Sequence, residues 1–454
     1  MGSMSLSSLM KNAENATKDV MKTVSAVIDE HSFVETDKFV SSNTDWGDAV
    51  GEGVVSGYAR IGDHRVGLFA TNPKVLKGSI GKTNAQKIAK IIHNATATAM
   101  PIVGILDTAG ARFDEGIDAM EGYAVIFRAL SEAYGTVPTA LIVKGVNFGL
   151  SSYFCHVADL CIGLKDAQIA SSSPLILAAN TKEDPQKVCQ SGSLAESAGI
   201  VTHVAANEKE AKTILQSFLS LLDAPLAQTK DDPNRTAKSE CKTLDALIGE
   251  VFDKGSVLAL RESYAKEVRT GFARLDGVAV GYVGIDGKLT TAGAGKVCEL
   301  LNTCESFDLP VINLVNCDGV LTSLATDGAV IREIADMMFA YNSVSVPKLA
   351  LIYGNAIGLG YTAFAAKACV DYAIAWENAK IGTVSGEAAA QLLYKEELAV
   401  APDKEKAAQK IAKAYSEENL SAPVVAAKGY LDNVIDPVLS RPYLIAALQT
   451  FIAE

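Results

Sequence analysis

The chain has 454 residues, of which 49% are hydrophobic and 36 are glycine, and its net charge is −12. This length predicts two to three domains, each with an apolar core. The acidic balance argues against binding of nucleic acid or anionic membranes, because phosphate recognition needs a basic surface.

No uncharged apolar stretch reaches the roughly 18 residues that a membrane span requires, so we expect no span. The first residues lack a basic segment followed by an apolar run, which argues against a secretory signal. Eight cysteines occur without a CxxC pair, and five histidines show no metal-ligand spacing. We therefore expect free thiols in a reducing cytoplasm, and no bound metal.

The predicted elements alternate between strands and helices along the whole chain. Roughly the first 45 residues have the pattern of an amphipathic helix and a polar loop, and Val54–Thr71 is a predicted β-hairpin with Gly62-Asp63 at its turn. The further strands predicted are Pro101–Asp107, Thr139–Val143, Leu160–Gly163, Gln168–Ser171, Val311–Val315, Leu349–Tyr353 and Tyr372–Ala375. The further helices predicted are Lys82–Ala99, Glu121–Tyr134, Ser151–Val157, Ile331–Tyr341 and Gly358–Ala368. This alternation predicts α/β domains with parallel sheets.

The two halves of the sequence repeat each other. VSGYARIGDHRVG, from Val55, returns as RTGFARLDGVAVG, and PIVGILDTAG, from Pro101, returns as PVINLVNCDG. VPTALIVKGVNFGL, from Val137, returns as VPKLALIYGNAIGL, from Val346, at the same offset of 209. A long period seen twice indicates a duplicated domain. The polar stretch Ala224–Ser239 is the predicted linker, and we place the domains at 1–232 and 233–454.

In each half a buried strand ends in glycine and leads into a helix, whose first N–H groups have no partner within the helix. A second strand end, at Thr108–Gly110 or Cys317–Gly319, supplies another free amide nearby. Two converging amides form a hole for a carbonyl oxygen that becomes an enolate or oxyanion. The alternative is that these glycines only allow tight packing, and recurrence of the pair in both halves favours the hole.

These segments resemble a known family. LDTAGARFDEG, from Leu106, resembles the D-S-G-G-A-R-x-x-E-G segment of biotin-dependent acyl-CoA carboxyltransferases, and KGVNFGLSSY, from Lys144, stands where that family has G-P-C-A-G-G-A-x-Y. DDPNR, from Asp231, matches its inter-domain stretch, and further motifs follow in family order to about Leu448. The departures are Leu150 and Leu359 at positions of the family's paired glycines, and the Asn316–Gly319 turn in place of proline-glycine.

The resemblance implies an α/β fold of two tandem crotonase-like (ClpP/crotonase) β/α spiral domains related by internal duplication. The N-terminal domain would bind acyl-CoA and the C-terminal domain biotin, with each site built between two subunits of a trimer of dimers. The backbone amides implied to hold the enolate and the ureido oxygen lie at Gly110, Ala111, Gly149, Leu150, Gly319, Val320, Leu359 and Gly360. No side-chain base is needed if biotin takes the α-proton after releasing CO₂.

Three side chains are candidates for contact with the substrate. Arg112 follows the first turn and is suited to a carboxylate or phosphate, with a salt bridge as the alternative. Lys82, with Lys74, Lys77 and Lys87, offers local positive charge to coenzyme A phosphates, or else lies on a solvated face. Thr362 stands where members of the family select the acyl chain, so the resemblance implies that it contacts the substrate.

Neither an ATP-binding glycine loop nor a Met-Lys-Met biotinylation motif occurs, so biotin carboxylase and the biotin carrier protein are expected as separate chains. Two alternatives remain open: the carboxyltransferase subunit of a biotin-dependent acyl-CoA decarboxylase, and a non-catalytic scaffold with altered turns. Hydration or isomerisation of enoyl-CoA is disfavoured, because the segments 151–155 and 361–365 contain no acid.

Overall fold

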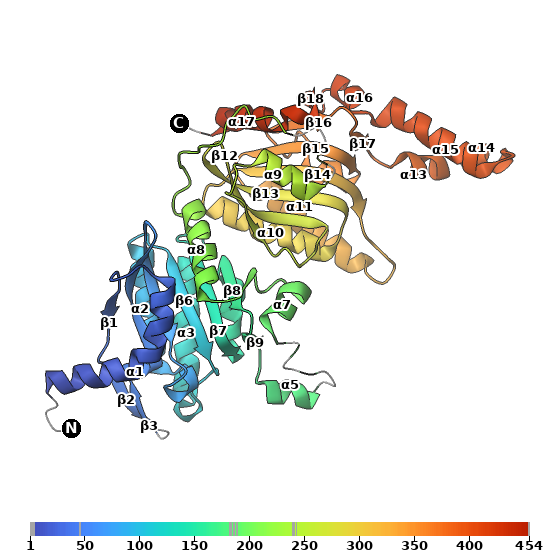
Figure 1. The fold of residues 1–454 in the computed structure, drawn as a ribbon. Helices are drawn as coiled ribbons and strands as arrows, with labels where there is room; N and C mark the ends of the chain where they lie inside the picture. Colours follow the sequence, from blue (N-terminus) through green and yellow to red (C-terminus); the bar gives the residue numbers. More distant parts are fainter. Residues whose placement is uncertain are drawn as a thin grey trace. The chain divides into compact units, whose positions relative to one another are not determined.

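The computed structural model describes residues 5–44, 47–180, 184, 187, 189–237, 241 and 243–452. The chain folds as two compact units, Met1–Ala224 and Pro225–Glu454, which Figure 1 colours from blue to green and from green to red. The division precedes the expected boundary at 232, because residues from Pro225 onward pair with the second unit. The Ala279 N–H donates to the Pro225 carbonyl at 2.7 Å, and the Ala227 N–H donates to the Gly277 carbonyl at 3.1 Å.

The first unit is built on an eight-stranded sheet with the order β1-β4-β5-β6-β7-β8-β10, in which β9 also pairs with β7. Its strands are β1 (Val34–Thr36), β4 (Val54–Ile61), β5 (His64–Thr71), β6 (Ile102–Thr108), β7 (Thr139–Phe148), β8 (Leu160–Leu164), β9 (Gln168–Ala170) and β10 (His203–Ala205). The pairs β1–β4 and β4–β5 are antiparallel, and the others are parallel. A separate hairpin is formed by β2 (Ser41–Thr44) and β3 (Gly47–Val50).

Helices and short turns connect these strands. The helices are α1 (Leu6–Val27), α2 (Lys82–Ala97), α3 (Ile117–Ala133), α4 (Phe154–Val157), α5 (Pro174–Asn180), α7 (Ser191–Ser197) and α8 (Glu208–Leu222). The 3-10 turns are η1 (Gly51–Gly53), η2 (Leu76–Gly78), η3 (Phe113–Glu115) and η4 (Gly149–Tyr153). One apolar core joins α2 and α3 to the sheet, where Ile88 and Ile126 pack with Ile102 and Leu141. Burial of this periodic apolar face is the main stabilisation of both helices.

The second unit repeats the sheet with the order β11-β12-β13-β14-β15-β16-β18, in which β17 also pairs with β15. Its strands are β11 (Leu258–Leu260), β12 (Val268–Leu275), β13 (Val278–Leu289), β14 (Val311–Val320), β15 (Lys348–Ile357), β16 (Tyr372–Trp376), β17 (Lys380–Gly382) and β18 (Asn433–Ile435). The expected duplication of an α/β domain is confirmed, because the two eight-stranded sheets have the same strand order.

The helices of the second unit include an arm of three, α13 to α15, that projects away from its sheet (Figure 1). The helices are α9 (Leu244–Val251), α10 (Thr291–Ser306), α11 (Asp327–Ser343), α12 (Leu359–Phe364), α13 (Gly386–Leu393), α14 (Lys395–Val400), α15 (Lys404–Tyr415), α16 (Ala422–Ala427) and α17 (Ser440–Phe451). A π-turn, η5 (Ser416–Leu420), and a 3-10 turn, η6 (Pro437–Leu439), complete the unit.

A glycine that recurs in both repeats lies at the equivalent strand pairing in both units. A Cβ atom at Gly57 would lie 2.2 Å from the Val34 carbonyl oxygen, and one at Gly271 would lie 2.3 Å from the Leu258 carbonyl oxygen. No side chain fits at such distances. The glycines shared by the two repeats in sequence are therefore required by the pairing of β4 with β1 and of β12 with β11.

The structure lengthens several predicted elements. β7 and β15 continue beyond Val143 and Tyr353, because their glycine-containing ends pair with β9 and β17. The helix predicted for Ser151–Val157 is a 3-10 turn followed by the four-residue α4, and α12 ends at Phe364 rather than Ala368. Local periodicity did not report these strand ends, since the partner strands come later in the chain.

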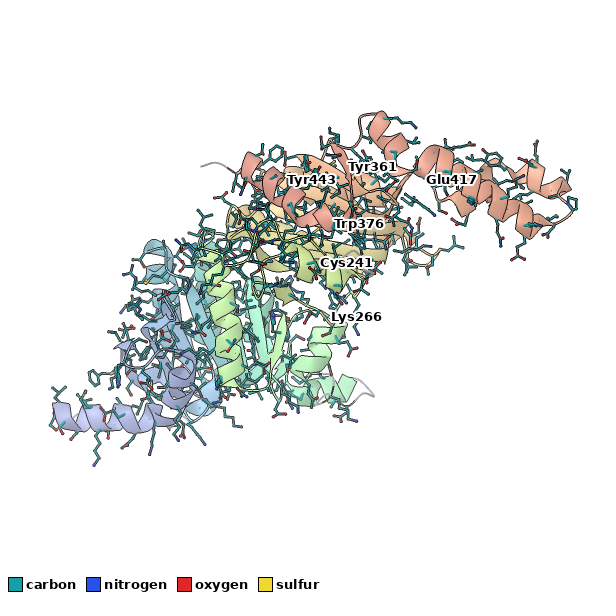
Figure 2. All side chains as sticks on the ribbon, turned by 45° about the horizontal axis from the view of Figure 1, so that its top comes forward. Cys241, Lys266, Tyr361, Trp376, Glu417 and Tyr443 are labelled. Carbon is teal, nitrogen blue, oxygen red and sulfur yellow. The ribbon has the colours of Figure 1, made fainter. Side chains whose placement is uncertain are left out.

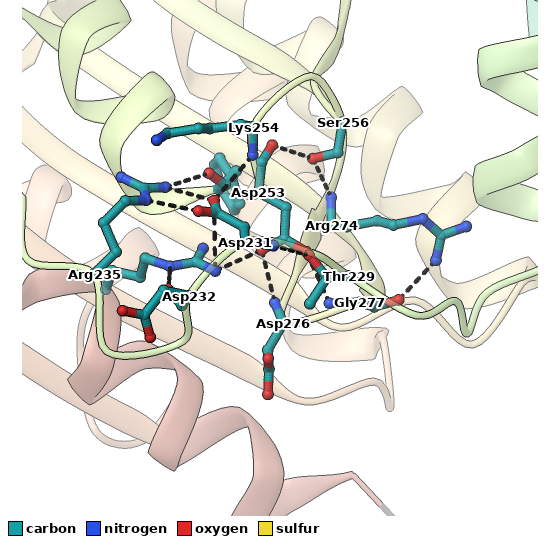
Figure 3. A network of polar contacts seen from close by, with 12 residues as sticks. Thr229, Asp231, Asp232, Arg235, Asp253, Lys254, Ser256, Arg274, Asp276 and Gly277 are labelled. Atoms are coloured by element: carbon teal, nitrogen blue, oxygen red, sulfur yellow. Dashed lines mark hydrogen bonds and ion pairs between the residues drawn. The ribbon is translucent and has the colours of Figure 1, made fainter.

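The predicted linker is held firmly where the structure describes it, and residues 238 and 239 lie outside the described part. Arg235 pairs with Asp231 at 2.9 Å and with Glu250 at 3.0 Å, and it also donates to the Phe252 carbonyl. Figure 3 shows this network around Asp231 and Asp253. The DDPNR motif therefore fixes the start of the second unit rather than acting as a loose connection.

Candidate active site

Two turns of the first unit come together where β6 and β7 end. Gly110 has φ +106°, and a Cβ atom there would lie 2.9 Å from the Phe148 carbonyl oxygen, at the end of β7. Gly149 has φ +73° and begins η4, so that Leu150 lies in the first turn of this short helix. First-turn amides have no partner within a helix. The turn at Gly110 and Ala111 thus lies against the end of β7, which continues into Gly149 and Leu150, and the Gly110 N–H donates to Thr108 Oγ1 at 3.2 Å.

The second unit repeats this arrangement. Gly319 has φ +91°, and a Cβ atom there would lie 3.8 Å from the Ile357 carbonyl oxygen. Gly358 has φ +55° and donates its N–H to the Gly382 carbonyl at 2.7 Å. Thr362 donates the first backbone bond of α12 to the Gly358 carbonyl at 3.1 Å. The N–H groups of Leu359 and Gly360 precede that bond and have no partner within the helix.

Val320 is the last residue of β14 and pairs with Leu289. The Leu321 N–H donates to the Leu289 carbonyl at 2.8 Å. At Gly360 the space is restricted, since a Cβ atom would lie 2.7 Å from the Cys317 carbonyl oxygen. Only glycine fits there, whereas the side chain of Leu359 is accommodated.

Lys82 and Arg112 take different positions around the first-unit turn. Arg112 is fully buried, and its guanidinium pairs with Glu52 at 2.9 Å and with Glu115 at 2.8 Å. This is the salt-bridge alternative in buried form, so Arg112 holds the turn and does not reach open space. Lys82 is half-exposed and pairs with Asp118 at 3.0 Å. Lys87 is buried and donates to the Gly51 carbonyl at 3.2 Å, which removes it from the group of surface lysines.

Thr362 lines a pocket of about 360 Å³ beside the second-unit turn. Its hydroxyl donates to the Gly358 carbonyl at 3.1 Å, and Tyr361 from the same helix also lines the pocket. Figure 2 shows Tyr361 on α12, and Glu417 where the helical arm joins the rest of the unit. Such a volume suits a small ring or acyl group, with polar groups that fix its orientation.

Sequence reasoning missed Asn147, which lies immediately before the first-unit turn. Asn147 is fully buried, and its Nδ2 donates to the Ser151 carbonyl and to the Cys155 sulfur, both at 3.2 Å. These bonds tie the end of β7 to η4 and α4. These two hydrogen bonds depend on how the turn folds. In the sequence, Asn147 is recognisable only as a polar residue next to an apolar strand.

Burial raises the pKa of two acidic groups near the turns, which favours their neutral forms. Burial raises the pKa of the Asp107 carboxyl, which lies just before the first-unit turn. Burial also raises the pKa of the Cys317 thiol to about 11, so this thiol stays protonated at neutral pH. The segments 151–155 and 361–365, which follow the turns at Gly149 and Gly358, carry no acidic side chain. The arrangement therefore offers oriented amides rather than a side-chain acid or base.

Within the described ranges, no cluster of three or more His, Cys, Asp or Glu side chains has the geometry to hold a metal ion. The search for a helix long and apolar enough to cross a membrane, made over the same residues, found none.

Comparisons with known proteins give the family. The profile of the family described as "Carboxyl transferase domain" matches residues 12–453. The chain is 31% identical over 453 residues to the methylmalonyl-CoA decarboxylase subunit alpha of Veillonella parvula, covering 93% of this chain and 87% of that protein. It is 29% identical over 428 residues to the propionyl-CoA carboxylase, carboxyltransferase subunit, of Haloferax mediterranei, covering 88% and 82%.

The crystal structure of transcarboxylase 12S, a hexamer with methylmalonyl-CoA and methylmalonic acid bound, matches with a TM-score of 0.91 and 26% identity, over 99% of this chain and 96% of that chain. Two repeated crotonase-like units with paired glycine turns thus define a two-domain carboxyltransferase fold. The chain belongs to the carboxyl transferase domain family. It is an enzyme of the biotin-dependent acyl-CoA carboxyltransferase type, which confirms the sequence prediction.

Proposed function

We propose that this chain is the carboxyltransferase component of a biotin-dependent acyl-CoA carboxylase, which moves carboxylate from carboxybiotin to the α-carbon of an acyl-CoA. The observation that carries the proposal is the duplicated pair of glycine turns, at Gly110 with Gly149 and at Gly319 with Gly358. Transfer between two ligands that each develop negative charge on an oxygen needs two such amide sites.

The turn of the first unit receives the thioester carbonyl in this proposal. Amides of Gly110, Ala111, Gly149 and Leu150 would stabilise the enolate oxygen that forms when the α-proton leaves. Arg112 acts through the backbone, because its buried ion pair with Glu52 fixes the turn that carries these amides. Lys82, at the surface, is the proposed contact for coenzyme A phosphate.

The turn of the second unit receives the ureido oxygen of biotin, which arrives on a separate carrier protein. The pocket of about 360 Å³ next to Gly358 and Thr362 fits a bicyclic ring in size and in its mixed polar and apolar lining. When bound, biotin supplies the carboxylate and accepts the α-proton. The chain contributes the amides of Gly319, Val320, Leu359 and Gly360. The two ligands must meet, so we place the acyl chain at the edge of the pocket that Thr362 forms.

A biotin carrier protein and a biotin carboxylase, as separate chains, are the proposed partners. The transcarboxylase 12S neighbour is a hexamer, and this supports a homohexamer for the present chain. Exposed apolar residues on the two repeated helices, Ile117 on α3 and Ile331 and Phe339 on α11, are the surfaces we expect to be covered. Light scattering of the full chain at micromolar concentration tests this, and a stable monomer would contradict it.

The direct test is isotopic exchange of carboxylate between acyl-CoA and free biotin, catalysed by the isolated chain. Label from carboxyl-labelled methylmalonyl-CoA should appear on biotin only when both ligands are present. A panel of malonyl-, methylmalonyl- and longer carboxyacyl-CoA ranks the acyl groups. If the folded hexamer moves no label with any of them, the chain is the scaffold that the leucine replacements allow.

A second candidate, the equivalent subunit of a biotin-dependent decarboxylase, is favoured by one observation. The Veillonella parvula relative at 31% identity is a methylmalonyl-CoA decarboxylase subunit. The transfer chemistry is the same in reverse, so the exchange assay does not separate these roles. Co-purification from the native source does: an ATP-dependent biotin carboxylase supports carboxylation, and a membrane-embedded partner supports decarboxylation.

A further inference from the structure

The helical arm meets the second-unit turn through an unusual element. Residues Ser416–Leu420 form a π-turn at the end of α15. π-turns are rare and occur frequently at functional sites, because the extra residue re-aims the side chains around it. Three local side-chain bonds support this turn: Ser416 Oγ donates to the Ala412 carbonyl, Asn419 Nδ2 to the Tyr415 carbonyl and Ser421 Oγ to the Glu417 carbonyl.

Leu420 of the π-turn packs against Gly382, which is hydrogen-bonded to Gly358 at the start of the second-unit turn. A Cβ atom at Gly382 would lie 2.3 Å from Leu420 Cδ2, so the buried leucine fills the space above this glycine. The carbonyl of the same Gly382 accepts the Gly358 N–H at 2.7 Å. A chain of contacts therefore leads from the π-turn through Gly382 to Gly358, where the second-unit turn begins.

The π-turn also forms one wall of the pocket at that turn. Tyr415, Asn419 and Leu420 line the pocket together with Gly358 and Thr362. The neighbouring Glu418 is exposed and does not contribute to this lining. Asn419 is exposed as well, which means that its side chain is available to a ligand and carries little of the core packing.

We propose that Asn419 is a specificity-determining residue that binds the ureido ring in the second-unit pocket. The inference rests on the proposed function. A ureido ring presents a carbonyl oxygen and N–H donors on adjacent positions. The backbone amides of the turn can donate to the ureido oxygen. The Asn419 carboxamide can accept from a ureido N–H through Oδ1, because its Nδ2 already donates to the Tyr415 carbonyl. The π-turn places this acceptor at the pocket wall.

The test compares Asn419→Leu with the matched control Glu418→Leu in the full chain, using free biotin as the carboxyl acceptor and methylmalonyl-CoA as the donor. Asn419→Leu should raise the KM for biotin roughly tenfold, the scale of one lost neutral hydrogen bond. The KM for methylmalonyl-CoA should stay within about twofold, and Glu418→Leu should behave like the parent chain in both. An equal change with Glu418→Leu, a change confined to the acyl-CoA, or no change would overturn the inference.

Direct binding of biotin, measured by saturation-transfer NMR on the same three proteins, separates this inference from the proposed function. If the parent chain is active and Asn419→Leu binds biotin as well as the parent does, only the inference about Asn419 is refuted. If the parent chain moves no carboxylate but binds biotin, and Asn419→Leu does not bind it, the proposed activity is refuted and the pocket assignment is supported. A parent chain that neither binds biotin nor moves carboxylate refutes both.

Discussion

The Oδ1 atom of Asn316 accepts the N–H of Asn355 at 2.7 Å, and so ties β14 to the glycine-containing end of β15. The first unit has the same contact at the equivalent positions, where Asp107 Oδ1 accepts the Val146 N–H at 3.1 Å. Each contact lies at the base of a glycine turn. The bond is present in both repeats although one supplies an acid and the other an amide, so the side-chain oxygen is the feature that they share.

Removal of that acceptor should therefore loosen the turn, whereas removal of charge should not. We expect Asn316→Ala to destabilise the second unit by about 1–3 kcal/mol, because a backbone N–H loses its partner. Asp107→Asn keeps the oxygen and should change the unfolding free energy by less than about 1 kcal/mol. Urea denaturation of both variants measures this, and equal destabilisation would contradict the shared role.

The amide of Leu359 gives a clean test of the second-unit hole. Leu359 is the first residue of α12, a position where proline fits helix geometry, and the glycine before it tolerates a following proline. Leu359→Pro removes one N–H donor and should lower kcat about 10²–10³-fold, the scale for loss of one oxyanion donor. Leu359→Ala keeps the N–H and should stay within about threefold. Steady-state kinetics with circular dichroism as the folding control decides between them.

Asp159 should make the first unit sensitive to pH. Its carboxylate accepts the Thr139 N–H at 2.9 Å, and burial raises its pKa to about 7. The folded state thus holds this proton more tightly than the unfolded chain. The stabilisation is fully present below about pH 4 and is lost as pH rises through 7, up to about 4 kcal/mol.

Asp159→Asn keeps an acceptor oxygen and should flatten the dependence of unfolding free energy on pH between 4 and 7. The repeat offers a control in Asp371, which is exposed and accepts the Lys348 N–H at 2.7 Å. Asp371→Asn should leave the slope of the parent chain unchanged. Thermal midpoints across this pH range measure both, and an unaltered slope in Asp159→Asn would show that another group titrates.

Arg441 is expected to be the costliest charge to remove from the second unit. It is fully buried and pairs at 2.7 Å with the buried Asp253, which Figure 3 labels in its network of polar contacts. Arg441→Met should cost about 3–5 kcal/mol, because it leaves a buried carboxylate without its counter-ion. Arg332→Met, which removes an exposed pair with Glu333, should cost less than about 1 kcal/mol. Similar unfolding free energies for the two variants would contradict this assignment.

The sequence by itself determined the order of strands and helices, the duplication, the family and the glycine turns. These follow from local periodicity and from residues such as Gly358, whose backbone angles few other residues adopt. Only the tertiary structure decided that Arg112 is buried against Glu52, 60 positions away, and that the π-turn at Asn419 reaches the pocket beside Gly358. A periodic pattern reports which face of an element is buried, but the partner of a charge or of a strand end is fixed by long-range packing.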